Sequence, residues 1–290
     1  MKVLVTGGEG FLGSNIAQSL DKSKHEVLIS TRTKRFNKVS KDQIYLNLED
    51  LDDISLYGFD AVVHCAANVY SKNQEQLFFI NAIQTAEFFK LAIRDHVKHF
   101  IFMSSVGVYG KSSKSIINVE TETNPYNTYT QSKLAAERML IDLAHQHDIS
   151  LSIIRAPMIY GKAAKGNYRI LARLIGNNLP IPIPFQENRR NFCNIQNITS
   201  FINHLINIEI DMLKQINYFI PADDKAISLE ELCKLIAKDL NKSFSYVRMP
   251  RRILEIIFIF LGKRNIIDSL FKDMLVSNSS AKKIGWKPFF

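Results

Sequence analysis

Cysteine is scarce in this chain of 290 residues, which contains Cys65, Cys193 and Cys233 and no others. No two of them share CxxC spacing, so neither a disulfide framework nor a zinc site is expected. We interpret all three as reduced thiols of a protein in a reducing compartment. The seven histidines show no metal-ligand spacing either, and we predict no metal site.

Long hydrophobic runs are also missing. The longest apolar stretch, from Ile253 to Leu261, contains Glu255 and spans roughly half the length that a bilayer helix needs. No membrane span is therefore expected. The chain also runs from Met1 directly into an apolar strand and a glycine-rich turn, which leaves no room for a signal peptide. These absences predict a cytoplasmic protein.

The stretch from Ile253 to Leu261 has two interpretations. Flanking basic residues would suit peripheral contact with an anionic membrane surface. These residues are Arg251, Arg252, Lys263 and Arg264. The alternative, which we favour, is a helix buried in a C-terminal lobe.

A dense basic tract interleaved with aromatic residues is absent too, although the formal net charge is +9. The basic residues are spread along the chain, with local groups at 32–41 and 248–252. This distribution argues against a nucleic-acid partner. It fits a groove for a phosphorylated ligand or an anionic surface.

Strand-like apolar runs alternate with helical patterns through the first half of the chain. The predicted strands are Lys2–Thr6, Glu26–Ser30, Ala61–Cys65, His99–Ser104 and Leu151–Arg155, and the predicted helices are Phe11–Leu20, Glu75–Arg94 and Tyr126–His147. Strands separated by helices of this length form βαβ units. The sequence therefore predicts an α/β fold with a Rossmann-type, doubly wound parallel sheet.

The second half has a different texture. Alternating prolines in Leu179–Pro184 exclude a helix or a central strand, because these residues lack an amide proton. Tyr218–Pro221 reads as a short strand, and Ser228–Leu240 as a helix that starts with a capping box of Ser228 and Glu231. We expect a dinucleotide-binding domain over residues 1–165 and a smaller, partly discontinuous substrate lobe over 166–290. Chains of this type often weave back to the sheet, here around residues 192–220.

The segment from Thr6 to Gly13 carries three glycines between a predicted strand and a predicted helix. In that context Gly7 permits a tight turn, Gly10 lets the backbone approach a pyrophosphate, and Gly13 lets the helix pack closely on the strand. The pyrophosphate would then lie at the positive end of the helix. This pattern predicts a dinucleotide site.

The residues after the second predicted strand bear on the choice of cofactor. No carboxylate follows Ser30, whereas Arg32 lies just beyond it. A carboxylate there would bind a ribose 2′-hydroxyl, and an arginine suits a 2′-phosphate. We therefore predict a preference for NADP(H), with NAD(H) as the alternative if Arg32 is only a solvated loop residue.

Tyr129 and Lys133 lie four residues apart, on one face of a predicted helix. A free tyrosine has a pKa of about 10, and a nearby ammonium lowers that pKa towards the range that proton transfer at neutral pH needs. Ser105 follows an apolar strand, and ligands of parallel sheets bind beyond the carboxyl ends of strands. Ser105 could hydrogen-bond a substrate carbonyl beside Tyr129.

Five segments together carry a family resemblance: TGGEGFLG, VVHCAA, FMSSVGVYG, PYNTYTQSKLAAE and RAPMIYG. In this order and spacing they resemble the extended short-chain dehydrogenase/reductase family, of the NAD-dependent epimerase/dehydratase type. The group includes bacterial sugar-nucleotide 4-keto reductases and 4-epimerases. The resemblance covers residues 1 to about 165.

The resemblance implies that Tyr129 is the acid/base, that Lys133 holds the nicotinamide ribose and lowers the tyrosine pKa, and that Ser105 is the catalytic serine. Asn81 matches the asparagine of the family's central helix. The implied cofactor-binding residues are Gly7, Gly10, Phe11, Leu12, Gly13, Arg32, Leu48, Ala66, Ala67, Tyr129, Lys133 and Pro157.

The substrate lobe resembles sugar-nucleotide enzymes more loosely. By that resemblance Asn167 and Arg190 would contact the substrate diphosphate, beside Ser105 at the sugar, and an arginine suits a phosphate physically. The alternative for Arg190 is a surface charge before a strand. The resemblance also favours a homodimer built on the long helices around Glu87 and Ala136.

The leading hypothesis is an NADPH-dependent reductase of a 4-keto-6-deoxyhexose carried on dTDP or UDP, in surface polysaccharide (O-antigen) biosynthesis. The first alternative is a 4-epimerase of a nucleotide-linked or lipid-linked sugar. An alternative of another class is a regulatory protein that binds NADP(H) without catalysis. A dehydratase is disfavoured, because Val106 and Gly107 stand where the family's dehydratases carry an Asp-Glu pair.

Overall fold

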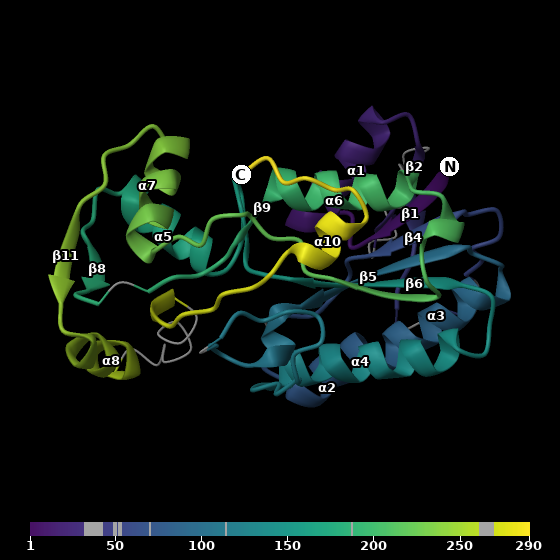
Figure 1. Ribbon diagram of the computed structural model, residues 1–290, viewed down its shortest axis with the longest axis horizontal. Coiled ribbons are helices and arrows are strands. Elements are labelled where there is room, and N and C mark those ends of the chain that lie inside the picture. Colours follow the sequence, from purple (N-terminus) through teal and green to yellow (C-terminus); the bar gives the residue numbers. More distant parts are fainter. Residues whose placement is uncertain are drawn as a thin grey trace.

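The computed structural model describes residues 1–31, 43–48, 51, 54–69, 71–113, 115–186, 188–260 and 270–290. They form two bodies that lie side by side (Figure 1). The larger one, the sheet body, holds the parallel sheet with helices on both faces. The smaller one, the second body, is built from α5, β8, α7, β11 and α8. The predicted α/β fold with a doubly wound parallel sheet is confirmed.

The sheet has seven strands in the order β10-β6-β5-β4-β1-β2-β3, and all neighbours are parallel. The strands are β1 (Lys2–Thr6), β2 (Glu26–Thr31), β3 (Gln43–Tyr45), β4 (Ala61–His64), β5 (His99–Ser105), β6 (Ser150–Ala156) and β10 (Ile216–Phe219). The strand order reverses between β1 and β4. Ligands of such sheets bind beyond the carboxyl ends of the strands at this switch point.

Helices cover both faces of the sheet (Figure 1). One face carries α1 (Phe11–Lys22), α6 (Ile195–Asn207) and α10 (Ser279–Lys283), and the other carries α2 (Gln74–Phe78), η1 (Phe79–Gln84), α3 (Thr85–Arg94) and α4 (Thr128–Ala144). Alternate β1 residues serve the two faces: Val3 and Val5 join the core that includes α1 and α6 residues, whereas Leu4 joins the core that includes α3 and α4 residues. Because both faces are covered, the central strands are mainly apolar, and the polar side chains that they bury, such as His99 and Ser152, hydrogen-bond to each other.

The second body has its own core and a small sheet. Its elements are α5 (Asn167–Gly176), β8 (Ile181–Pro184), α7 (Leu229–Asp239), β11 (Tyr246–Met249) and α8 (Arg251–Phe260). Strand β8 pairs with β11 alone, so its prolines occupy a two-stranded sheet in which each strand is an edge. The predicted capping box at the start of α7 is present, since Ser228 and Glu231 bind each other's backbone amides.

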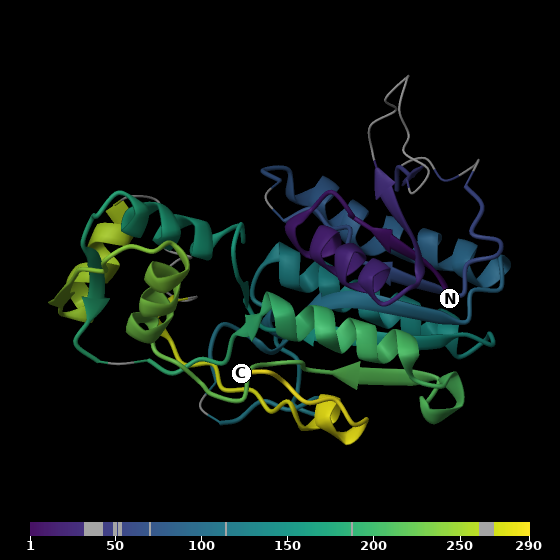
Figure 2. The same cartoon turned by 90° about the horizontal axis from the view of Figure 1, so that it is seen from above.

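Several segments connect the two bodies. The chain leaves the sheet through β7 (Ile159–Tyr160) and returns through β9 (Cys193–Asn194) to α6, then η3 (Ile210–Met212) and β10. Residues 270–290 cross back from the second body, and Trp286 packs against Phe201 of α6. Figure 2 shows the C-terminus at the junction of the bodies. The division at residue 165 therefore stays a proposal about domains. Within the described ranges, no helix is both long enough and apolar enough to cross a membrane.

Candidate active site

The glycine turn between β1 and α1 is closed so tightly that side chains are excluded from it. Gly7 has φ of +66°, and a Cβ there would lie 2.9 Å from the Ala66 amide nitrogen. A Cβ on Gly13 would lie 2.4 Å from the Gly7 carbonyl oxygen. Gly10 precedes α1 without a side-chain cap, and the first turn of α1 carries no acidic residue. The amide end of α1 is therefore suited to an anion.

A cleft of about 500 Å³, the glycine-turn cleft, opens above this turn. Its lining residues come from the ends of β1, β2 and β4 and from the neighbouring loops: Gly7, Glu9, Gly10, Ser30, Leu46, Asn47, Leu48, Cys65, Ala66, Ala67, Asn68, Gln76, Ile80 and Lys165. The structure thus brings together five of the predicted cofactor residues: Gly7, Gly10, Leu48, Ala66 and Ala67.

The other predicted cofactor residues lie around this cleft or outside it. Phe11 and Leu12 open α1, where Phe11 packs against the core of the second body and Leu12 against the core of the sheet body. Pro157 is buried directly after β6. Arg32, on which the predicted NADP(H) preference depends, lies outside the described residues.

Glu9 and Ser30 are two cleft residues that sequence reasoning missed. The Ser30 hydroxyl accepts a hydrogen bond of 3.0 Å from the Gly7 amide and so fixes the turn to β2. The Thr31 hydroxyl donates to a Glu9 carboxylate oxygen at 3.2 Å, which holds a negative charge at the carboxyl end of β2. Glu9 precedes β2 in the sequence, whereas a ribose-binding carboxylate is expected after that strand. The available signal was Glu9 itself, in the middle of the glycine motif.

Ser105 and the helix that carries Tyr129 meet at the end of β5. The Ser105 hydroxyl accepts a hydrogen bond of 3.1 Å from the Gly107 amide, which starts the 3₁₀ helix η2 (Val106–Tyr109). A Cβ on Gly107 would lie 2.6 Å from the Thr130 side chain, so η2 rests directly on the first turn of α4. Asn127 caps that turn through a hydrogen bond with the Thr130 amide. Tyr129 lies in the same turn and is half-buried.

Lys133 is buried one turn beyond Tyr129. Its ammonium lies 4.6 Å from the centre of the Phe102 ring. Burial lowers the pKa of Lys133 to about 8, and the nearby Cys65 and Glu137 partly offset this. Cys65 also lines the glycine-turn cleft, so Lys133 lies beneath the floor of that cleft. Burial raises the pKa of the Cys65 thiol to about 12, which makes it a poor nucleophile.

A buried ion pair holds α4 against the sheet. The Arg155 guanidinium of β6 donates to Glu137 of α4 at 2.6 Å, and both side chains are at most 7% exposed. Arg155 also donates to the Tyr109 hydroxyl at 2.6 Å and lies over the rings of Tyr109 and Tyr218. Burial lowers the pKa of Arg155, but its hydrogen bonds and the Glu137 charge more than compensate and leave that pKa raised. The Ser104 hydroxyl donates to Glu137 as well.

Sequence reasoning missed this pair, although a signal was present. Glu137 follows Lys133 by four residues, just as Lys133 follows Tyr129. The three residues therefore share one helix face. On this face Lys133 lies over the Phe102 ring of β5 and Glu137 pairs with Arg155 of β6, so the face anchors the helix on the sheet.

Asn81 explains why the predicted helix 75–94 is interrupted. The structure replaces one continuous helix by α2, the π-helix η1 and α3, and Asn81 lies in η1. Its amide donates to the Asn68 carbonyl at 2.8 Å and to the Ser132 hydroxyl at 3.2 Å, and its oxygen accepts from the Asn68 amide at 2.7 Å. Asn81 thus joins a wall of the glycine-turn cleft to α4, which is a positioning role.

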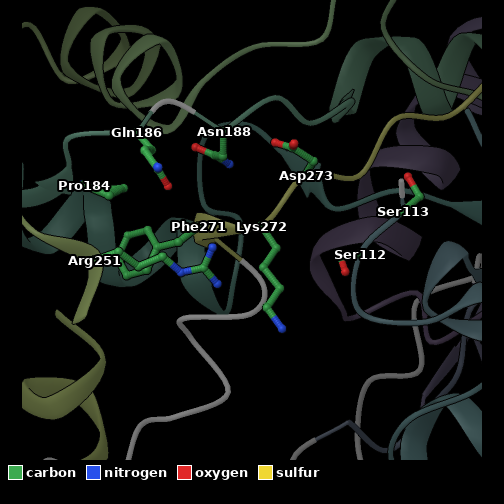
Figure 3. A pocket seen from close by; sticks show the side chains of 9 residues that line it. All are labelled: Ser112, Ser113, Pro184, Gln186, Asn188, Arg251, Phe271, Lys272 and Asp273. Atoms are coloured by element: carbon green, nitrogen blue, oxygen red, sulfur yellow. The ribbon is translucent and has the colours of Figure 1, made fainter. Parts of the chain in front are cut away.

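A second cleft, of about 280 Å³, lies where the second body meets the loop after η2. Its lining residues, shown in Figure 3, come from distant segments: Ser112, Ser113, Pro184, Gln186, Asn188, Arg251, Phe271, Lys272 and Asp273. In this second-lobe cleft, Ser112 and Ser113 face the charged side chains of Arg251 and Lys272 from the opposite side (Figure 3). The cationic groups suit an anionic ligand.

Arg190 lies beside the second-lobe cleft and is buried, unlike the surface charge that sequence analysis left as an alternative. Its guanidinium donates to the Lys272 carbonyl at 2.7 Å and approaches the Met274 sulfur at 3.4 Å. Burial lowers the pKa of Arg190 to about 10, and Tyr126 and the carboxylate of Asp273 partly offset this. Because Tyr126 also borders Gly107, Arg190 lies near the turn that carries Ser105.

Asn167 is the first residue of α5 and is half-buried. It follows Gly166, whose φ of +66° turns the chain into the helix. Lys165, two residues earlier, lines the glycine-turn cleft. Asn167 therefore lies in the segment between that cleft and the second body.

Comparison with known proteins supports the family. The model of the NAD-dependent epimerase/dehydratase family matches residues 3–208. UDP-glucose 4-epimerase of Vibrio cholerae is 30% identical over 99% of this chain and 90% of its own length. N-acetyl-alpha-D-glucosaminyl-diphospho-ditrans,octacis-undecaprenol 4-epimerase of Escherichia coli O157:H7 is 25% identical over 86% of this chain and 75% of its own.

A solved structure shares the fold. UDP-glucuronic acid 4-epimerase from Bacillus cereus, in complex with NAD, has a TM-score of 0.76 at 18% identity, covering 100% of this chain and 94% of that one. The sequence motifs, the doubly wound sheet and the family match agree with one another. The chain belongs to the NAD-dependent epimerase/dehydratase family, within the extended short-chain dehydrogenases/reductases.

Proposed function

We propose that the protein is a nicotinamide-dependent 4-epimerase of a sugar carried on a diphosphate. The proposal is carried by two contacts: Lys133 lies near Cys65, which lines the glycine-turn cleft, and the turn after Ser105 rests on the first turn of α4. The chain also resembles a 4-epimerase over nearly its whole length. The relatives favour this alternative over the 4-keto reductase of the leading hypothesis.

The glycine-turn cleft fits a dinucleotide. Side chains at Gly7 and Gly13 would collide with backbone atoms, so the turn leaves its amides accessible to a pyrophosphate. Leu48 would lie against the adenine, and Ala66 and Ala67 would border the channel towards the nicotinamide. Lys133, beneath this floor, would hold the nicotinamide ribose.

The choice between the two nicotinamide cofactors turns on Glu9. Its carboxylate is held at the carboxyl end of β2 by Thr31. A carboxylate at that place accepts a hydrogen bond from a ribose 2′-hydroxyl and repels a 2′-phosphate. We therefore propose NAD(H) in place of NADP(H), which also suits an enzyme that returns its cofactor to the starting state in each turnover.

The chain's own residues would move one proton in each direction. When bound, the cofactor supplies reversible hydride acceptance from the sugar carbon. The Tyr129 phenolate takes the proton of the C4 hydroxyl as that carbon is oxidised, and returns it to the same oxygen when the carbon is reduced from the other face. The Lys133 ammonium stabilises the phenolate, and Ser105 donates a hydrogen bond to the C4 oxygen. The sugar leaves with no net oxidation.

The diphosphate would lie among the cationic groups around the second-lobe cleft, which are Arg190, Arg251 and Lys272. Asn167 would contact it from the start of α5. The carrier beyond the diphosphate is a nucleoside in the first candidate function. A polyprenol is the second candidate, because Arg251 belongs both to this cleft and to α8, whose apolar side chains are exposed.

The proposal is tested by proton NMR of UDP-glucose, UDP-N-acetylglucosamine and a short polyprenyl-diphosphate N-acetylglucosamine, each incubated with the protein and NAD. We expect conversion of at least one substrate to a mixture of 4-epimers without net formation of NADH. Tyr129→Phe should lower kcat by about 10²- to 10⁴-fold, because the acid/base is lost, while cofactor affinity is retained. Tyr57→Phe, at an exposed surface position, is the matched control.

Two results would contradict this proposal. One is stoichiometric oxidation of NADPH by a 4-keto sugar with no epimerisation of any substrate, which would restore the reductase. The other is unchanged turnover in Tyr129→Phe. Cofactor binding with no turnover of any sugar would favour the regulatory alternative. The cytoplasmic location and the homodimer stay predictions.

A further inference from the structure

Helix α8 lies at the edge of the second body (Figure 1), and most of its apolar side chains are exposed. The exposed ones, the α8 face, are Ile253, Ile256, Ile257, Ile259 and Phe260, whose exposed fractions range from 41% to 92%. Leu254 is the one residue of α8 that is buried. The helix is therefore not the buried element that sequence analysis favoured. Contiguous apolar surface of this kind marks a contact with a protein or a membrane.

The charge around the α8 face is positive. Between Tyr246 and Phe260 the chain carries three arginines and one glutamate. Glu255 is paired with Arg251 at 2.9 Å, and Arg248 is paired with Glu230 of α7 at 2.7 Å. Arg252 is exposed and adds a positive charge at the start of the face. An apolar helix face bordered by arginines complements a surface that is anionic above and apolar beneath.

The α8 face adjoins the second-lobe cleft. Arg251 and Gln186 line both that cleft and a neighbouring hollow of about 490 Å³. The hollow also includes Arg252 and Glu255 of α8. A ligand that leaves the second-lobe cleft on this side therefore reaches the start of the exposed helix.

We propose that the α8 face docks on an anionic lipid bilayer, with its apolar side chains inserted among the lipids and its arginines at the headgroups. A second copy of the chain is the competing occupant of the face, and the test below distinguishes it from a bilayer. The docking itself does not depend on the proposed function. Docking would bring the second-lobe cleft to the membrane surface, and the assignment of a diphosphate to that cleft rests on the proposed function.

The test is co-sedimentation of the full chain with vesicles of phosphatidylglycerol and phosphatidylethanolamine, and with vesicles of phosphatidylcholine alone. We expect stronger binding to the anionic vesicles. The double variant Ile256→Ser, Phe260→Ser should reduce the partition coefficient by at least about tenfold, since two large apolar side chains no longer enter the bilayer. The matched control, Tyr57→Ser with Met212→Ser, removes two exposed apolar side chains from the sheet body and should bind as the wild type does.

Three results would overturn the docking proposal. The wild type could stay in the supernatant with anionic vesicles, or the α8 double variant could bind them as well as the control does. The α8 double variant could also convert a dimer to a monomer without changing vesicle binding, which would assign the face to a second copy. Thermal unfolding of both variants checks that they fold. Epimerisation of a nucleotide sugar is measured separately, so its failure would count against the proposed function and leave the docking result intact.

Discussion

Two buried arginines are held in different ways by the two regions of the molecule. Arg155, in the sheet body, is paired with Glu137 and enclosed by two tyrosine rings, and its pKa is raised. Arg190, beside the second-lobe cleft, donates to the backbone of Lys272, and burial lowers its pKa to about 10. The charge of Arg155 is balanced within the fold. Arg190 borders the second-lobe cleft, where the proposed function places the diphosphate.

Arg155 maintains the structure, whereas the proposed function gives Arg190 a part in binding. In the sheet body, Arg155 fixes the helix that carries Tyr129 and Lys133, and it touches neither cleft. Around the second-lobe cleft, the cationic groups come from segments that are far apart in the sequence. Mutations at the two arginines should therefore affect different quantities.

The largest effect on stability is expected for Arg155→Met. The substitution leaves Glu137 buried without its partner, which should lower the free energy of unfolding by about 3–5 kcal/mol. Urea denaturation measures this change. The double variant Arg155→Met, Glu137→Met removes both charges and should recover much of the loss. Equal losses in the single and double variants would mean that the pair is not what anchors α4.

A smaller effect, on binding, is expected for Arg190→Met. Loss of a charged hydrogen-bond donor at the diphosphate should raise KM by about 10- to 100-fold, with kcat changed much less. The free energy of unfolding should change by less than in Arg155→Met, because no buried carboxylate is known to lose its partner. Arg189→Met is the matched control. Arg189 is the next residue in the sequence, but its side chain is 48% exposed and is paired with Glu231. If both variants raise KM equally, Arg190 has no specific role in the cleft.

The sheet body could be predicted from the sequence because its signals are local. Strand β1 matches its predicted range, and each of the other predicted strands of the first half differs from the structure by one or two residues at its ends. The glycine turn, the end of β4 and the Tyr129–Lys133 pair are each short motifs whose own residues are close together in the sequence. A parallel sheet then brings such segments to one edge without further information.

The second region could not be predicted in the same way. Its cleft combines Ser112 with Arg251 and Lys272, and no local pattern relates positions so far apart. Helix α8 was missed as a surface element for a different reason. Its sequence is apolar on nearly every side, and such a pattern indicates burial unless the neighbouring elements leave it uncovered. Tertiary packing decided that outcome.

A smaller effect, on the choice of cofactor, is expected for Glu9→Gln in the glycine turn of the sheet body. Removing the carboxylate should raise the affinity for NADPH relative to NADH by about tenfold, or about 1.4 kcal/mol, because a 2′-phosphate is no longer repelled. Fluorescence titration with both cofactors measures the ratio. Glu26→Gln removes the same charge at the opposite end of β2 and should leave the ratio unchanged. A wild type that already binds NADPH more tightly would return the preference to the Arg32 interpretation.

The smallest effect on the free energy of unfolding is expected for Gly176→Ala. Gly176 belongs to the second body and is compared with Gly13 of the glycine turn. A Cβ at Gly176, the last residue of α5, would meet no atom within 4 Å. Alanine should therefore raise the free energy of unfolding by about 0.4–1 kcal/mol, as it restricts the unfolded chain. At Gly13 the same change would place a Cβ 2.4 Å from the Gly7 carbonyl oxygen, so Gly13→Ala should lose both stability and NAD affinity. Urea denaturation should show a higher free energy of unfolding for Gly176→Ala and a lower one for Gly13→Ala, and NAD titration measures the loss of affinity in Gly13→Ala. Opposite changes in stability would mean that the tight turn requires glycine, and that glycine is not required at every position. A tolerated Gly13→Ala would show that the turn can open without cost, and the close packing of α1 on β1 would then have no part in cofactor binding.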